Sequence, residues 1–368
     1  MKYVPIFAIL MMLLAACARV AAPMGAVVGS GQPQAAPSES ATPDDAGTPV
    51  PVPSAPPTLL PEERPPAGAS VQFRTDFGRH SVPYSEFLSG GPPKDGIPAV
   101  DKPNFLPVGK VTDLAETEPV IGLQIGDTFR AYPLRILIWH EIVNDSVGGV
   151  PVAVTFCPLC NAAMVFDRRA GARVLDFGTT GMLRNSDLVM YDRQTETWWQ
   201  QFLGAAIVGE LNGTVLKVLP SRLESWARFR ARAPGGLVLV PDNPGLRAYG
   251  RNPYEGYDSS ARPFLYGGET PEGIAPLARV VSLADRSQAW SLDLLKARRE
   301  ITLADGTVMT WEAGQNSALG DGWIPSGADV GNILVQRKVD GVWADIPYFI
   351  DFAFAFHAFH PASTIHLP

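Results

Sequence analysis

The chain has 368 residues and a hydrophobic content of 46%, which is enough material for one large or two medium folded domains. Its formal net charge is -7 and its sequence pI is near 5.3. This acidic balance argues against nucleic acid as a partner, because surfaces that bind nucleic acid are basic.

The N-terminus resembles a bacterial lipoprotein signal. Residues 1–3 form a short basic segment, and the apolar run 4–14 that follows is too short to span a bilayer. The following Leu-Ala-Ala-Cys is similar to a lipobox, so residues 1–17 are predicted to be a signal peptide that is cut before a lipidated Cys17. Acyl chains on Cys17 would anchor the protein to a membrane, which is thus its predicted partner. The protein would lie in the cell envelope, on the extracytoplasmic side. A plain signal peptide with an incidental cysteine is the alternative.

The next segment, residues 18–67, is rich in Pro and Ala and has no apolar periodicity. Such sequence cannot bury enough surface to offset the entropy of ordering, so we predict a disordered, partly polyproline tether. The remaining residues, 68–368, are predicted to form the globular body.

Turn dipeptides recur through this body between short apolar runs, which predicts a mainly β, antiparallel, hairpin-rich fold. The turns are Gly126-Asp127, Gly148-Gly149, Ala170-Gly171, Asn212-Gly213, Asp305-Gly306 and Asp340-Gly341. Few helices are expected, and the best candidates are residues 134–142, just after Pro133, and 221–231.

The body also carries an internal repeat, with units at about 120–178 and 280–350. The two units match in pattern more than in identity. The second unit has no His or Cys where the first has His140, Cys157 and Cys160. The fold therefore does not need the cysteine pair to close, which favours a functional role for it.

That pair, Cys157 and Cys160, follows an apolar run of strand character, and Cys17 is the only other cysteine. Two thiols at C-x-x-C spacing can form a disulfide, act as a redox dithiol or bind one metal ion. His140 lies one hairpin earlier and is predicted to approach the thiols as a third ligand or to lower a thiol pKa. A histidine satisfied by local hydrogen bonds is the alternative.

The C-terminal stretch 352–361 is dense in phenylalanine, and its alternation predicts a buried strand. His357 is predicted to be a core or turn residue. His360 is the candidate to complete a Cys2His or Cys2His2 metal site.

Two polar loops beside a pair of tryptophans predict a lined pocket. Its candidate residues are Arg184, Asn185, Ser186, Asp187, Asp192 and Arg193. Side chains that merely brace a large sheet are the alternative.

Several motifs together resemble one family, DUF3179. They are A-Y-P-L (131–134), H-E-I-V-N-D (140–145), G-G-V-P-V-A-V-T-F-C-P-L-C-N (148–161), V-F-D-R (165–168), L-R-N-S-D-L-V-M-Y-D-R-Q-T (183–195), W-W-Q-Q (198–201) and A-F-H-P (358–361). The resemblance covers about residues 70–365 and departs at Phe-Ala-Phe 354–356, where a tryptophan-rich version is expected. It implies an exported or lipid-anchored bacterial or archaeal protein of unknown function. It also implies that His140, Cys157, Cys160, Asn185, Asp187 and Asp192 are motif positions, without giving their roles.

The sequence therefore predicts a surface-anchored lipoprotein with a Cys157/Cys160 site near His140 that binds a single transition metal, zinc or copper. A dithiol redox protein and a binding module with a structural disulfide are the alternatives. Whether the protein is an enzyme, and which redox or metal-donor partner it meets, stay open. A thioredoxin fold is disfavoured, because the short segment 161–166 leaves no room for the long helix that activates its first cysteine.

Overall fold

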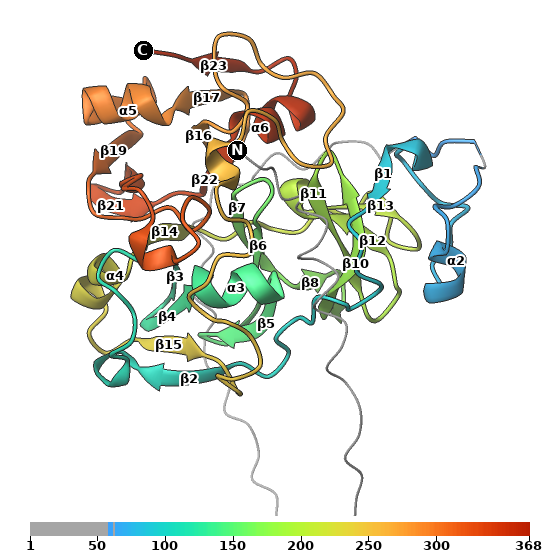
Figure 1. Ribbon diagram of the computed structural model, residues 1–368, viewed down its shortest axis with the longest axis horizontal. Coiled ribbons are helices and arrows are strands. Elements are labelled where there is room, and N and C mark those ends of the chain that lie inside the picture. Colours follow the sequence, from blue (N-terminus) through green and yellow to red (C-terminus); the bar gives the residue numbers. More distant parts are fainter. Residues whose placement is uncertain (1–57, 62) are drawn as a thin grey trace, which may run out of the picture. The chain divides into compact units, whose positions relative to one another are not determined.

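Antiparallel hairpins make up most of the body (Figure 1). The computed structural model describes residues 58–61 and 63–368, so the predicted signal peptide, Cys17 and most of the predicted tether lie outside the described residues. The predicted turns at 126–127, 148–149 and 340–341 each join two paired strands. The prediction of a mainly β protein with short helices is confirmed.

The first repeat unit has the order hairpin, helix, three-stranded sheet, strand, helix, strand. Its elements are β3 (Pro119–Ile125), β4 (Thr128–Pro133), α3 (Leu134–His140), β5 (Ile142–Val147), β6 (Val150–Cys157), β7 (Ala162–Asp167), β14 (Ser221–Ser225), α4 (Trp226–Arg232) and β15 (Leu237–Val240). β14 pairs with β3 in antiparallel fashion, and β15 pairs with β4 in parallel.

The second unit repeats this order with one extra strand. Its elements are β16 (Arg279–Leu283), β17 (Gln288–Ser291), α5 (Leu292–Arg298), β18 (Glu300–Thr302), β19 (Val308–Glu312), β20 (Asn332–Val339), β21 (Val342–Asp345), β22 (Tyr348–Phe352), α6 (Ala353–Phe359) and β23 (Thr364–His366). β22 and β23 pair with β16 and β17 as β14 and β15 do with β3 and β4. Glu141 after α3 and Arg299 after α5 even share a positive φ, 58° and 65°. The two units thus share one order of elements, and both extend beyond the ranges predicted from the sequence.

The segment between β7 and β14 adds most of a further five-stranded sheet, in which β1 is an edge strand. The elements outside the two units are α2 (Ala69–Gln72), β1 (Phe87–Ser89), β2 (Asn104–Pro107), β8 (Arg169–Ala170), β9 (Arg173–Val174), β10 (Phe177–Arg184), β11 (Asp187–Asp192), β12 (Trp198–Gln200) and β13 (Ala205–Val208). β2 extends the sheet of the first unit by pairing with β15.

Two local predictions were wrong, the first of them only in part. Of the helix predicted over 221–231, residues 226–231 do lie in α4. Residues 221–225 instead form β14, because they pair with β3 about a hundred residues earlier in the chain, a partnership that local pattern cannot reveal. The phenylalanine-rich stretch 353–359 forms helix α6 and not a strand. Its alternation arises because the helix is buried on two sides, with Phe354 in the large core cluster and Phe356 in a smaller one.

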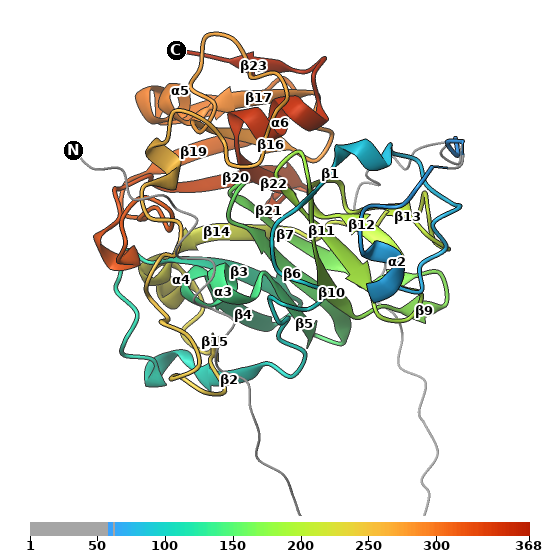
Figure 2. The same ribbon diagram turned by 45° about the vertical axis from the view of Figure 1, so that its right-hand side comes forward.

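The two units meet at the end of the β6–β7 hairpin. The backbone N–H of Phe352 in β22 donates to the carbonyl of Cys160 at 2.9 Å, and the Asn161 side chain donates to the carbonyl of Ile350 at 2.8 Å. Figure 2 shows β22 of the second unit beside β7 of the first. The C-terminal half of the chain therefore helps to hold the turn that carries the cysteines.

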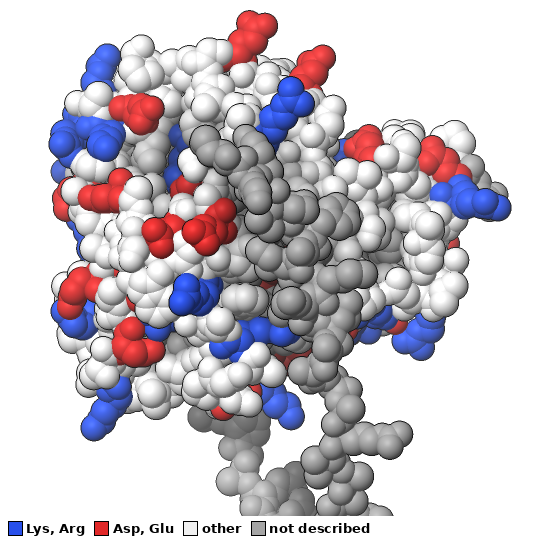
Figure 3. Space-filling model, in the orientation of Figure 1, with Lys and Arg blue, Asp and Glu red and all other residues white. Residues whose placement is uncertain are grey.

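Charged side chains of both signs lie interspersed on the face shown in Figure 3. Several form surface pairs, such as Arg228 with Glu312. Among the described residues, none of the helices has the length and apolar content that crossing a bilayer requires.

Candidate metal centre

The two cysteines lie on one tight hairpin turn, which we call the cysteine turn (Cys157–Asn161). Cys157 is the last residue of β6 and pairs with Ala162, the first residue of β7. The backbone N–H of Cys160 donates to the carbonyl of Cys157 at 3.3 Å, and Asn161 has a φ of 52°. This tight reversal brings the two sulfurs together, and both cysteines are buried free thiols.

Asp187 reaches the same place from a second hairpin. A two-residue turn, Asn185-Ser186, joins β10 to β11, and both residues have positive φ, as the type I′ turns of tight hairpins require. Asp187 begins β11 and is buried. Its Oδ2 accepts hydrogen bonds from Gln200 Nε2 at 2.6 Å and Phe202 N at 2.9 Å. Its Oδ1 has no hydrogen-bond partner within the described part of the chain.

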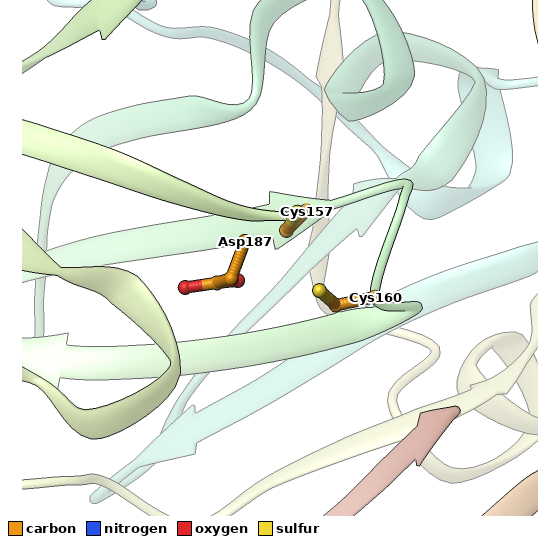
Figure 4. Close-up of side chains that lie close together, drawn as sticks. All are labelled: Cys157, Cys160 and Asp187. Carbon is orange, nitrogen blue, oxygen red and sulfur yellow. The ribbon is translucent and has the colours of Figure 1, made fainter. Parts of the chain in front are cut away.

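Cys157, Cys160 and Asp187 form a buried group whose ligand atoms all lie within 4.8 Å of one another (Figure 4). Two thiolates and a carboxylate oxygen are ligands that zinc takes in proteins. The chemistry and spacing of this group therefore allow it to hold a single metal ion.

Burial is the main influence on the protonation of the group. Burial raises the pKa of both thiols, and that of Cys160 lies well above its usual value. Burial also raises the pKa of Asp187 to about 7, against the hydrogen bonds from Phe202 and Gln200 that lower it. No imidazole among the described residues lowers the pKa of either thiol, contrary to the prediction for His140. A bound cation would favour the ionised forms of all three ligands.

Neither predicted histidine ligand belongs to this group. His140 is buried at the end of α3, and its ring nitrogens bond to the carbonyl of Pro98 and the hydroxyl of Tyr249, each at 2.8 Å. These contacts match the alternative of a locally satisfied histidine. His360 follows α6, and its buried Nε2 lacks a partner within the described part of the chain. Burial, with the nearby Arg286, lowers the pKa of His360 to about 4.

The polar residues predicted to line a pocket separate into two sets. Ser186 and Asp187 lie at the cysteine turn, where the carbonyl of Ser186 accepts from the Cys157 thiol at 3.8 Å. Asp192 instead accepts from Trp199 Nε1 at 2.9 Å, and Arg193 forms an ion pair with Asp101. These last two brace the sheet, as the alternative reading predicted.

Arg184 and Asn185 flank the second hairpin turn without joining the group. Arg184 donates to Glu86 Oε2 at 2.6 Å, and Asn185 supplies one of the turn's two positive φ angles. Their role is to shape the hairpin that carries Asp187.

A long segment between β15 and β16, residues 241–278, covers the centre, and we call it the strap. It contains only a short 3-10 turn, Tyr257–Ser259, and Figure 1 shows it running in yellow to orange from β15 past α3. Three side-chain hydrogen bonds tie it to residues beside the centre: Tyr249 with His140 at 2.8 Å, Tyr257 with the carbonyl of Leu159 at 3.0 Å, and the carbonyl of Phe264 with Ser186 at 2.5 Å. Access to the two cysteines and Asp187 from this side therefore requires the strap to move.

Glu141 is the side chain at the centre that sequence reasoning missed. It directly follows His140 in the H-E-I-V-N-D motif, and it is 8% exposed. Burial, and then the charge of Asp187, raise the pKa of Glu141 to about 8. The available signal in the sequence was the position of this acidic residue directly after His140, a predicted ligand.

A mainly β fold of two repeated units, with a buried group of two thiols and a carboxylate, defines the class of protein. A family model described as "Protein of unknown function (DUF3179)" matches residues 94–363, and the chain belongs to this family. The comparison with curated proteins found no match, and neither did the comparison with solved structures. The matched residues include both cysteines and Asp187, and the family predicted from the motifs is confirmed.

Proposed function

We propose that this protein binds a single transition-metal ion, which Cys157, Cys160 and Asp187 ligate. The observation that carries the proposal is the convergence of two buried thiols and a buried carboxylate, whose ligand atoms all lie within 4.8 Å of one another. Burying ionised groups without compensation costs several kcal/mol each, and a divalent cation supplies the compensation. The unpartnered Oδ1 of Asp187 is a free acceptor at this position.

Zinc fits this donor set better than copper. Both metals accept cysteine thiolates, but Cu(I) prefers an all-sulfur environment, whereas zinc takes carboxylate oxygens as well. The two thiolates and Asp187 together carry three negative charges, so a divalent ion leaves the centre at -1 and a monovalent ion leaves it at -2. The smaller residual charge costs less to bury.

A dithiol redox role has weaker support. The thiolate is the attacking species in thiol–disulfide exchange, and burial raises the pKa of both thiols. No long helix follows Cys157 to stabilise its thiolate, because Ala162–Asp167 is a strand.

Metal content tests the proposal. The purified full-length protein is expected to retain about one zinc ion per chain after gel filtration in metal-free buffer, measured by plasma mass spectrometry. Asp187→Asn and the double change Cys157→Ser with Cys160→Ser should each lose the ion, because each removes ligands. Asp192→Asn is the matched control, since Asp192 is a buried carboxylate of the same strand that bonds to Trp199. Wild-type protein free of metal, even after growth with added zinc and copper, would refute the proposal.

We further propose that the protein works in the cell envelope, anchored by lipid on Cys17. The lipobox-like Leu-Ala-Ala-Cys and the short apolar run before it support this. Cys17→Ser is expected to move the protein from the membrane fraction to the soluble fraction. Labelling with an alkyne fatty acid should mark the wild type and not the variant. A membrane-bound, signal-cleaved Cys17→Ser protein would contradict the anchor.

A further inference from the structure

The two oxygens of the Asp187 carboxylate have different surroundings. Oδ2 accepts two hydrogen bonds, from Gln200 Nε2 at 2.6 Å and from the backbone N–H of Phe202 at 2.9 Å. Oδ1 is buried, and no residue that the structure describes forms a hydrogen bond with it. A carboxylate oxygen has two lone-pair positions, so those of Oδ2 are both occupied and those of Oδ1 are both free. Oδ1 is therefore the oxygen that can take a further partner without the loss of a hydrogen bond.

Of the two donors to Oδ2, Gln200 is the one that acts through its side chain. Gln200 is the last residue of β12 and is buried. Phe202 lies in the short 3-10 turn that follows, Gln201–Leu203, and contributes only its backbone N–H. One stretch of chain therefore holds the carboxylate from the side of Oδ2, and a substitution of Gln200 removes half of that hold.

Arg184 determines which end of the Gln200 amide faces Asp187. Its Nη1 donates to Gln200 Oε1 at 3.4 Å, and its Nε donates to Glu86 Oε2 at 2.6 Å. A guanidinium offers donors and no acceptor, so the oxygen of the amide lies toward Arg184 and its NH2 group toward Asp187. Arg184 is also the cross-strand partner of Asp187 in the β10–β11 hairpin. A chain of hydrogen bonds therefore runs from the partly exposed Glu86 to the buried carboxylate.

We propose that Gln200 is a positioning residue of the metal centre, which holds Oδ2 so that Asp187 binds the ion through Oδ1 alone. This inference rests on the proposed metal site. A carboxylate binds a metal through one oxygen or through both, and binding through both would require Oδ2 to give up hydrogen bonds. Outer hydrogen bonds of this kind orient the ligands of many protein metal sites.

The consequence concerns the coordination number. With Asp187 limited to one oxygen, the two thiolates and Oδ1 fill three positions of a tetrahedral ion. The fourth position then stays open to a molecule from outside the chain, as in zinc sites that act on substrates, whereas structural zinc sites are closed by four protein ligands.

The rival explanation is that Gln200 only stabilises the fold, as a buried amide with satisfied hydrogen bonds. Its removal would then lower the melting temperature equally with and without metal. The affinity for the ion and the spectrum of the bound ion would stay as in the wild type. If Gln200 positions Asp187, both must change.

The test compares the full-length wild type with Gln200→Met, Arg184→Met and the control Asn144→Leu. Methionine is unbranched like glutamine but donates no hydrogen bond. Asn144 is also a buried amide, and it bonds to Asp101 and to the backbone of Phe177. Zinc affinity is measured by competition with a chromogenic chelator, and Co²⁺ replaces zinc for visible spectroscopy.

We expect Gln200→Met to bind zinc about 10- to 100-fold more weakly, the usual loss when an outer hydrogen bond to a metal ligand is removed. Its cobalt d–d bands should weaken, because a carboxylate released at Oδ2 can bind through both oxygens and raise the coordination number. Arg184→Met should show the same changes to a smaller degree, because the amide of Gln200 is then free to rotate. Asn144→Leu should keep the affinity and the spectrum of the wild type.

The outcomes separate this inference from the metal site itself. A wild-type protein that binds neither zinc nor cobalt overturns both. Wild-type binding, with unchanged affinity and spectrum in Gln200→Met, overturns the role of Gln200 and leaves the metal site standing. An equal loss in Asn144→Leu also overturns that role, because it would reflect a general loss of stability. If Gln200→Met does not fold, Arg184→Met decides: a wild-type affinity and spectrum overturn the role, and a weaker affinity with altered bands supports it.

Discussion

Chelation of the bound ion is expected to lower the melting temperature of the wild-type protein by on the order of 10 °C. A ligand present at about a thousand times its Kd stabilises the folded state by roughly 4 kcal/mol, and each kcal/mol moves the melting temperature of a domain of 150–250 residues by about 2–4 °C. The measurement is differential scanning calorimetry with and without a membrane-permeant zinc chelator.

The control for this prediction is the double variant Cys157→Ser with Cys160→Ser. It should fold, because β19 and β20 of the second unit form a paired hairpin without cysteine, and its melting temperature should not respond to chelator. A wild-type protein whose melting temperature is equally insensitive would show that no ion contributes to its stability.

Arg286→Met is expected to cost about 3–5 kcal/mol of unfolding free energy. Arg286 forms a buried ion pair with Asp351, which is 0% exposed and follows Ile350, the residue that binds the cysteine turn. Removing the cation alone leaves the carboxylate of Asp351 without its counter-charge in the core. Urea unfolding followed by tryptophan fluorescence measures the change.

The matched variant removes both charges, Arg286→Met with Asp351→Ala. It should be more stable than Arg286→Met alone, because no isolated charge is then left in the core. If the double variant is as unstable as the single one, the cost lies in the packing of Arg286 on Phe349 and Phe202 and not in the charge of Asp351.

Local signals were enough to predict the hairpins and the repeat. Tight hairpin turns need residues with positive φ, and Gly-Asp, Gly-Gly and Asp-Gly dipeptides supply them. Such dipeptides therefore indicate turns from local sequence alone. Helix α3 was predicted after Pro133 and ends two residues earlier than expected, at His140. The strand Ser221–Ser225 was missed because its partner, β3, is remote in the sequence.

The candidate centre was predicted in part. Cys157 and Cys160 are only three positions apart in the sequence, so their partnership needs no tertiary information. Asp187 was predicted only as a pocket residue. Its position beside the thiols depends on how two separate hairpins pack together, which the local sequence does not show. His140 was predicted to approach the thiols, but its ring bonds to Pro98 and Tyr249, which are remote from it in the sequence. A sequence motif identifies the segment but does not show which of its side chains reach the centre.

The tie between Asn161 and Ile350 spans 189 positions, and this has a consequence for how the protein is made. A chain that emerges from its N-terminus exposes both thiols long before β22 and the strap exist to cover them. During that interval the pair is open to oxidation and to whatever ions its surroundings offer. The two thiols are therefore made before the segments that cover them in the finished fold.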